Sequence, residues 1–152
     1  MLSAKKNIRF PTAAMLVIGD EILSGRTQDC NTQFIASKLT EVGINLSEVR
    51  VVSDSSNDII AAVNILRSMY TYLFTSGGIG PTHDDITADA IAQAFEVSIS
   101  VREDAKLILS SNYLDGEKSL NEARLRMARI PDGATLIDNP ISKAPGFSLQ
   151  NV

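Results

Sequence analysis

The sequence has few of the residues that build disulfides and thiolate metal sites. Cys30 is its one cysteine and His83 its one histidine. An intrachain disulfide and a cluster of Cys and His metal ligands are therefore both excluded. We expect Cys30 to be a packing residue and His83 to be a solvated loop residue rather than a catalytic one.

Long apolar runs are also missing. No run approaches the roughly 18 residues that a membrane-spanning helix requires. No apolar segment follows the Lys5–Lys6 pair, as one would in a secretory signal. We therefore expect a cytoplasmic protein without a membrane partner.

Positive charge is in deficit, with 14 Lys and Arg against 18 Asp and Glu and a formal net charge of −4. Nucleic-acid binding needs clustered Lys and Arg, so the composition argues against a nucleic-acid partner. The chain has 152 residues, of which 44% are hydrophobic and 21% charged, and this suits one globular domain. We expect a flexible lead-in over residues 1–11 and a single domain over residues 12–152.

An alternation of strands and helices predicts the fold. The apolar run 13–18 suits a strand buried on both faces, and further strands are expected at 44–52 and 72–75. Each strand precedes a helical pattern: the first is capped by Asn31, with Phe34, Ile35, Leu39 and Val42 on its apolar side, and the third carries Ala90, Ile91, Ala94 and Phe95. Serial βα units predict an α/β fold, a three-layer αβα domain with a mostly parallel sheet.

The periodicity after residue 96 is weaker. It predicts an edge strand at 97–101, helices at 103–114 and 121–129, and a strand at 134–137. Residues 139–147 are loop-like. Because a parallel sheet rarely stops on a loop, we expect the chain to be a fragment.

A glycine-rich segment from Thr75 to Thr87 follows the third predicted strand. Gly77, Gly78 and Gly80 allow either a plain tight turn or a close approach of backbone N–H groups to a phosphate at the start of the next helix. The spacing fits neither the ATP-binding P-loop nor the dinucleotide fingerprint.

Carboxylates follow each of the three strands. Asp84 and Asp85 lie in the glycine-rich segment, Asp20 and Glu21 in the loop 19–27, and Asp54 in the loop 53–56. Helix capping or a surface turn could explain each loop by itself, and capping is our first interpretation of the loop 53–56. However, parallel strands bring these loops to one edge, where carboxylates beside a phosphate suit a Mg²⁺-like ion.

Three arginines form a small basic cluster. Arg124, Arg126 and Arg129 occur within one predicted helix. We interpret them as a solvated helix face, and contact with a phosphate is the alternative.

Three ordered blocks of sequence resemble a known family. The blocks are Ile18-Gly19-Asp20-Glu21-Ile22-Leu23-Ser24-Gly25, then Gly77-Gly78-Ile79-Gly80-Pro81-Thr82-His83-Asp84-Asp85-Ile86-Thr87, then Asn139-Pro140 with Ala144-Pro145-Gly146-Phe147. In these blocks the chain is similar to the molybdenum-cofactor biosynthesis (MoaB/Mog-like, molybdopterin-binding) domain. It resembles most the version found at the N-terminus of CinA-type competence/damage-inducible proteins.

The resemblance implies a MoaB/Mog-like fold that forms a trimer or dimer and binds a nucleotide or pterin phosphate. It also implies that the domain over residues 12–152 lacks its C-terminal strand, which in the family usually follows the block that matches Ala144-Pro145-Gly146-Phe147. Mog-like members adenylylate molybdopterin, whereas CinA-like members are associated with metal-dependent hydrolysis of ADP-ribose-type pyrophosphates. The stretch Thr82-His83-Asp84-Asp85 is CinA-like and favours the hydrolase. The alternatives are a molybdopterin-binding or adenylyl-transferring domain, and a non-catalytic binding or oligomerisation module.

The resemblance also assigns roles to residues. Asp85, Asp54 and Asp84 are the expected catalytic residues and the ligands of a divalent cation (Mg²⁺, Mn²⁺ or Co²⁺). The expected nucleotide or pterin contacts are Gly19, Asp20, Glu21, Ser24, Gly25, Gly77, Gly78, Gly80 and Thr82. The central hypothesis is that Asp20, Asp54 and Asp85 lie close enough together to hold one cation and its diphosphate.

Overall fold

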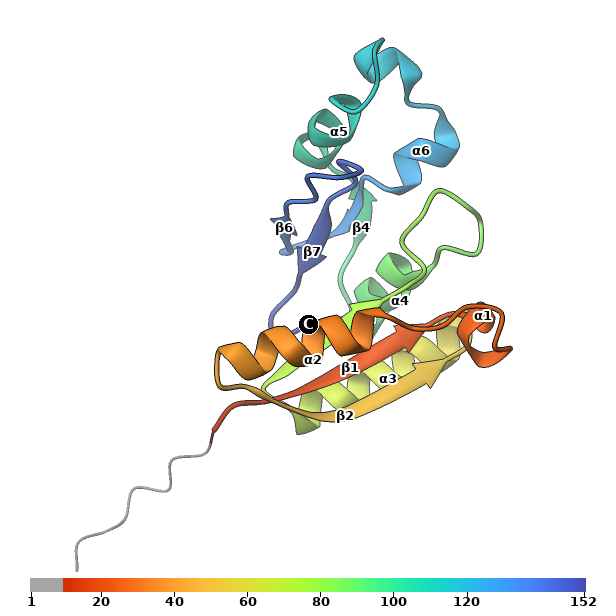
Figure 1. Ribbon diagram of the computed structural model, residues 1–152. Helices are drawn as coiled ribbons and strands as arrows, with labels where there is room; N and C mark the ends of the chain where they lie inside the picture. Colours follow the sequence, from red (N-terminus) through yellow and green to blue (C-terminus); the bar gives the residue numbers. More distant parts are fainter. Residues whose placement is uncertain (1–9) are drawn as a thin grey trace, which may run out of the picture.

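Three parallel strands form the central sheet of the protein (Figure 1). The computed structural model describes residues 10–152, so most of the expected lead-in over residues 1–11 lies outside the described residues. Strand β1 (Thr12–Ile18) lies between β2 (Asn45–Val52) and β3 (Tyr72–Ser76). Six of the seven β1 residues are buried, as the apolar run predicts for a central parallel strand.

Helices cover both faces of this sheet. Helix α2 (Asn31–Glu41) lies on one face, and α3 (Ser56–Met69) lies on the other, where α4 (Thr87–Ala94) packs against it (Figure 1). Because side chains alternate along a strand, Leu16 and Ile18 pack toward α3 while Met15 and Val17 point to the α2 side. The predicted three-layer αβα arrangement is confirmed.

The chain beyond α4 adds no strand to the central sheet. It forms two antiparallel pairs, β4 (Ile99–Val101) with β5 (Arg129–Pro131) and β6 (Thr135–Ile137) with β7 (Gly146–Ser148). Helix α5 (Glu103–Ser110), the 3₁₀ helix η1 (Gly116–Ser119) and helix α6 (Glu122–Arg126) complete this part. The strand predicted at 97–101 is therefore not an edge of the main sheet.

Two predicted helices are shorter than expected. The helix predicted over 103–114 ends at Ser110, and the one predicted over 121–129 ends at Arg126. Arg129 belongs instead to β5, where pairing with Val101 overrides the local helical pattern. Strand β7 lies partly in the segment predicted as a loop, because it forms by pairing with β6 and has no strand pattern of its own.

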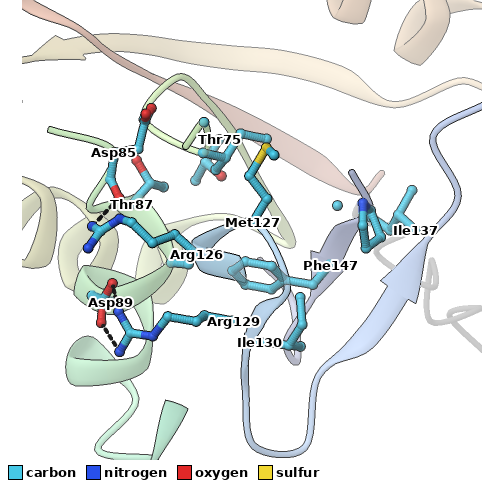
Figure 2. Close-up of a pocket in the computed structure, with 16 residues that line it drawn as sticks. Thr75, Asp85, Thr87, Asp89, Arg126, Met127, Arg129, Ile130, Ile137 and Phe147 are labelled. Carbon is cyan, nitrogen blue, oxygen red and sulfur yellow. Dashed lines mark hydrogen bonds and ion pairs between the residues drawn. The ribbon is translucent and has the colours of Figure 1, made fainter. Parts of the chain in front are cut away.

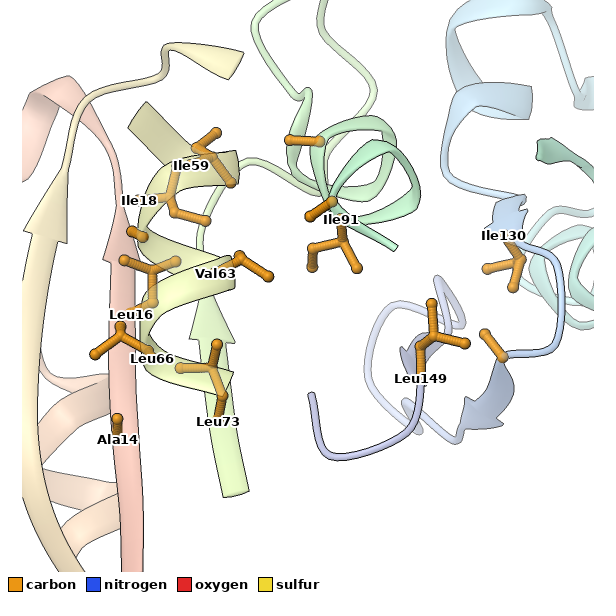
Figure 3. Packing of buried hydrophobic residues seen from close by; sticks show 14 of the residues in the cluster. Ala14, Leu16, Ile18, Ile59, Val63, Leu66, Leu73, Ile91, Ile130 and Leu149 are labelled. Carbon is orange, nitrogen blue, oxygen red and sulfur yellow. The ribbon is translucent and has the colours of Figure 1, made fainter. Parts of the chain in front are cut away.

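One hydrophobic cluster connects the central layers with the later part of the chain (Figure 3). Leu16 and Val63 fill the space between the sheet and α3, and Ile91 of α4 belongs to the same cluster. Leu109 of α5 and Ile130 of β5 extend it into the second part. All five side chains are essentially fully buried.

The last described residues fasten the chain to the start of β3. Leu73 N donates to the main-chain oxygen of Asn151 over 2.8 Å. The Asn151 side chain donates to the carbonyl oxygens of Arg67 (2.9 Å) and Tyr70 (3.2 Å) at the end of α3. Asn151 thus satisfies carbonyl groups that the helix leaves without internal partners.

The start of α2 differs from the prediction. Asp29 Oδ1 accepts from the backbone N of Asn31 (2.9 Å) and Thr32 (3.3 Å), so Asp29 rather than Asn31 caps the helix. Cys30 is exposed, which corrects its prediction as a packing residue. Phe34 and Val42, predicted on the apolar side of this helix, are 62% and 69% exposed, whereas Leu39 of the same set is buried.

Over residues 10–152, no helix combines the length and the apolar character needed to cross a bilayer.

Candidate functional site

The segments that follow β1 and β2 are bonded to each other. The first, predicted as the loop 19–27, begins with the short helix α1 (Asp20–Leu23). Asp20 N donates to Asp54 Oδ2 over 2.9 Å, and Gly19 N donates to the carbonyl oxygen of Val52 over 3.1 Å. The Asp54 carboxylate therefore joins the two loops and does not cap α3, which corrects our first interpretation of the loop 53–56. Parallel topology places both loops at the carboxyl edge of the sheet, as predicted.

The glycine turn after β3 packs against β1 and α4. Gly77 has a φ of +101°, and a Cβ at this position would overlap the carbonyl oxygen of Ile18. Gly78 has a φ of +63°, and its Cβ would overlap Thr87 Oγ1. The Thr87 hydroxyl is buried and donates to the carbonyl oxygen of Gly77 over 2.8 Å. The two glycines are thus required by the close packing of the turn.

Helix α2 supports the same turn from the other side. Asn31 Nδ2 donates to Ser76 Oγ over 2.5 Å. This bond connects the first turn of α2 with the last residue of β3. Asn31 is therefore a supporting residue of the site that sequence reasoning assigned only to helix capping.

Asp85 folds back on its own loop. Its Oδ2 accepts from Thr82 N (2.8 Å) and from Thr82 Oγ1 (2.5 Å). Burial by itself raises the pKa of Asp85, but hydrogen bonds from Thr82 and from the Gly80 backbone, together with the charge of Arg126, hold that pKa below its ordinary value. Asp85 is thus ionised in the folded protein at neutral pH.

Seven of the predicted site residues line one acidic cavity of about 410 Å³ at this edge of the sheet. They are Asp20, Glu21, Asp54, Gly78, Thr82, Asp84 and Asp85. Arg26, whose Nε donates to Ser24 Oγ over 3.0 Å, also lines this cavity. Five carboxylates against one guanidinium give the cavity a strongly negative lining, which would repel a bare phosphate.

The carboxylates of the acidic cavity do not form a complete set of metal ligands in the described residues. Over residues 10–152, no three His, Cys, Asp or Glu side chains are grouped so that they could hold a metal ion by themselves. Asp20, Asp54 and Asp85 share the cavity, but in residues 10–152 these three carboxylates do not form a group that could hold one cation by themselves, whereas the central hypothesis expected such a group.

The other predicted site residues lie around this cavity. Gly80 lines a second cavity on the far side of Asp85, and Gly77 lines a third next to α2. Gly19, Ser24 and Gly25 are absent from the lining of these three cavities in the described part of the chain. The side chain of His83 is 89% exposed, with Nε2 at 2.9 Å from Asp84 Oδ1, which agrees with its interpretation as a solvated residue.

The second cavity, of about 160 Å³, opens between the glycine turn, α4 and the β6–β7 pair (Figure 2). Arg126 and the Arg129–Asp89 ion pair, with a shortest N···O distance of 2.7 Å, face this cavity. Met127 and Phe147 form part of its apolar wall (Figure 2).

This placement corrects the interpretation of the arginines as a solvated helix face. Arg124 stacks on the ring of Tyr113 at 4.2 Å, and Arg129 is paired with Asp89. Arg126 Nη2 donates to the carbonyl oxygen of Asp85 over 3.3 Å. The sequence showed that the three arginines are close together along the chain. Their contacts could not be predicted, because they depend on α6 ending at Arg126 and on Arg129 lying in β5.

A cavity formed by three loops at the carboxyl edge of a parallel sheet defines the class of the protein, an α/β ligand-binding domain. The family described as probable molybdopterin binding domain matches residues 14–152. The chain belongs to this family.

Curated relatives extend well beyond the matched region. A protein of Metallosphaera sedula is 38% identical over 139 residues, which cover 91% of this chain and 52% of that protein. A protein of Thermococcus kodakarensis is 40% identical over 148 residues, covering 91% and 59%. A probable FAD synthase of Caenorhabditis briggsae is 40% identical over 111 residues, covering 71% and 21%. The chain thus spans about half the length of the first two relatives.

Solved structures agree with the fold. The structure of the CinA protein of unknown function from Thermoplasma acidophilum is similar, with a TM-score of 0.84 and 34% identity over 91% of this chain and 80% of that chain. The tungsten cofactor synthesizing protein MoaB from Pyrococcus furiosus has a TM-score of 0.56 and 18% identity, over 95% and 84%. The second likeness concerns the fold alone.

Proposed function

We propose that the domain binds the diphosphate of a nucleotide-type ligand together with a divalent cation and hydrolyses ADP-ribose-type pyrophosphates. The observation that carries this proposal is the acidic cavity, where carboxylates from three separate loops meet the glycine turn. Helix capping would not require Asp20, Asp54 and Asp85 to share one cavity. An anionic ligand can enter a lining this negative only if a cation accompanies it.

The residues of the cavity fit a hard cation such as Mg²⁺. Their oxygen donors are of the type that Mg²⁺ prefers, and Mg²⁺ usually takes only one or two carboxylates and completes its shell with water and phosphate oxygens. In the described residues, Asp54 accepts from Asp20 N through Oδ2 and Asp85 accepts from Thr82 through Oδ2; a carboxylate has about four lone-pair sites, so both keep acceptor capacity for a cation. A bound cation would supply charge neutralisation of the phosphates.

Each part of the site has a role in this proposal. One or two of the carboxylates of Asp54, Asp84 and Asp85 hold the cation, whose remaining ligands are water and phosphate oxygens, and Asp54 also orients the attacking water. Gly78, Gly80 and Thr82, with Gly77 behind them, position the phosphates. The fixed loops lower the activation barrier in two ways. They hold the attacking water in line with the phosphorus and the leaving oxygen, and they stabilise the negative charge that develops in the transition state.

Release of AMP from ADP-ribose tests this function. We expect turnover with Mg²⁺, Mn²⁺ or Co²⁺, and a loss of at least about 100-fold in Asp85→Asn, since charge-stabilising groups contribute about that much. The control is Asp138→Asn, an equal charge change at an exposed position, which should keep wild-type turnover. Equal turnover in Asp85→Asn and wild type would contradict the role assigned to Asp85. If wild type releases no AMP with any of the three metals, the hydrolase function is contradicted.

A second candidate is a molybdopterin-binding or adenylyl-transferring domain, which the family match favours. The same cavity would then hold a pterin phosphate without hydrolysing ADP-ribose. Saturable binding of a pterin phosphate by a protein that releases no AMP would distinguish this function from the hydrolase.

Self-association belongs to the proposal as well. We infer a dimer or trimer, from the resemblance to Mog-like domains. Sedimentation equilibrium tests this, and a monomer at all concentrations would contradict it. Stable oligomers that neither bind nor turn over either ligand would favour a pure assembly role.

A further inference from the structure

The second cavity lies beside the acidic one and shares the lining residues Gly78 and Asp85 with it. Its walls differ from those of the acidic cavity. On one side lie the glycine turn and the start of α4, and on the other lie apolar side chains that include Met127, Ile130 and Phe147. A partly apolar space therefore lies directly next to the acidic cavity.

Arg126 is the guanidinium of this cavity that lacks a carboxylate partner. Arg129, its neighbour in the wall, has both terminal nitrogens engaged with Asp89, at 2.7 and 2.8 Å. For Arg126, no carboxylate of residues 10–152 lies within ion-pair distance. Its one contact through Nη2 is the 3.3 Å bond to the carbonyl oxygen of Asp85, which is long for an N–H···O bond.

The Nε atom of Arg126 is also unsatisfied. It is buried and has no hydrogen-bond partner among the described residues. Buried polar groups normally have partners, and leaving a charged donor without one is unfavourable. By contrast, Arg124 on the same helix donates to the carbonyl oxygen of Ser119 over 2.6 Å and stacks on Tyr113.

We propose that Arg126 is a phosphate-binding residue: it donates to a phosphoryl oxygen of an organic, nucleotide-type phosphate that lies between the glycine turn and the apolar wall of the second cavity. This inference rests on the proposed function, because the acidic cavity supplies the cation side of the same diphosphate. Arg126 approaches from the opposite side. Its planar guanidinium suits phosphate geometry. The apolar wall formed with Phe147 and Met127 favours an organic ligand over inorganic phosphate.

Binding of α,β-methylene-ADP, an analogue whose bridge resists hydrolysis, tests the proposal without turnover. Calorimetric titration in the presence of Mg²⁺ compares wild type with Arg126→Gln, Arg126→Lys and Arg124→Gln. We expect Arg126→Gln to weaken binding by about 10- to 100-fold, the range for hydrogen bonds to charged groups. Arg126→Lys should lie between, because it keeps the charge and loses the planar fork. The control Arg124→Gln, an equal charge change on the same helix, should bind like wild type.

Adenosine provides the second arm of the experiment, because it lacks phosphate. A phosphate-binding role predicts that Arg126→Gln does not change the affinity for adenosine, whereas a structural role would weaken both ligands. Wild-type affinity of Arg126→Gln for the analogue, or an equal loss for adenosine, would overturn the proposal. Failure of the wild type to bind the analogue would also overturn the proposal for Arg126. The AMP-release assay then shows separately whether the proposed hydrolase function is contradicted as well.

Discussion

Asp85 illustrates how one side chain serves both structure and the proposed chemistry. Its Oδ2 closes the loop by accepting from Thr82, while the carboxylate faces two cavities. Hydrogen bonds from Thr82 and Gly80 stabilise the ionised carboxylate of Asp85. The loop is therefore most stable with Asp85 in the form that can bind a cation. Gly80 is needed beside it, since a Cβ there would lie 2.7 Å from Oδ2.

The lowered pKa of Asp85 predicts a pH-dependent stability. Because this pKa is lower in the folded protein, the stabilisation is complete above the ordinary aspartate pKa of about 3.9 and is lost as pH falls through the folded-state pKa. Asp85→Asn should therefore melt below wild type at pH 6, and the two melting temperatures should converge as pH falls toward 2. Thermal melts across this range measure the difference. In a protein that carries Thr82→Val and so lacks the hydroxyl donor, Asp85→Asn should lower the melting temperature at pH 6 by less. A difference in melting temperature between Asp85→Asn and wild type that does not change with pH would contradict the account.

Residue-scale prediction from the sequence succeeded where topology alone decides position. Asp20, Asp54 and Asp85 follow strands whose parallel order brings them to one cavity. The partners of their carboxylates were not predictable, because the Asp20–Asp54 bond joins residues 34 positions apart. Arg126 was missed as a cavity residue for the same reason, since its partner, Asp85, is 41 positions away.

At the scale of the elements, the glycine turn after β3 is the most constrained connection. Its backbone crosses the end of β1 at Ile18 and the start of α4 at Thr87, and both contacts leave no space for a Cβ. The turn therefore places Gly78 reproducibly between the two cavities.

Alanine substitutions test this constraint. Gly43→Ala, at a φ of +76° with open space around it, should lower the free energy of unfolding by about 1–2 kcal/mol through backbone strain alone. Gly77→Ala should lower it considerably more, because the Ile18 carbonyl is fixed within β1. Urea unfolding of both variants measures the difference. Equal losses would show that the turn has room to relax.

Strong local patterns predicted the central elements, and long-range pairing determined the others. The apolar run of β1 and the periodic faces of α3 and α4 are properties of contiguous sequence, so their prediction was accurate. Strands β4 to β7 have three residues each. Weak local patterns predicted strands at the positions of β4 and β6 but not of β5 and β7, which form by antiparallel pairing with β4 and β6.

For the whole molecule, the shared hydrophobic cluster indicates a single cooperative unit. Side chains from β1, α3, α4, α5 and β5 all belong to it, so neither part of the chain has a core of its own. The second cavity, bordered by both parts, should keep its shape only while this cluster is intact.

Unfolding should therefore occur in one transition. Leu109→Ala in α5 should lower the free energy of unfolding by about 2–5 kcal/mol, the usual range for a buried leucine, and shift far-ultraviolet circular dichroism and tyrosine fluorescence together. Leu107→Ala, on the same helix but 56% exposed, is the matched control and should change little. Two separate transitions would show that residues 99–149 unfold independently.

The central claim is that one cation and the diphosphate bind together in the acidic cavity. The most direct measurement is paramagnetic broadening of backbone amide signals by Mn²⁺ in the presence of α,β-methylene-ADP. Broadening confined to residues around Asp20, Asp54, Gly78 and Asp85, and abolished in Asp85→Asn, is the predicted result. Broadening that is spread over the acidic surface, or that persists unchanged in Asp85→Asn, would contradict the account.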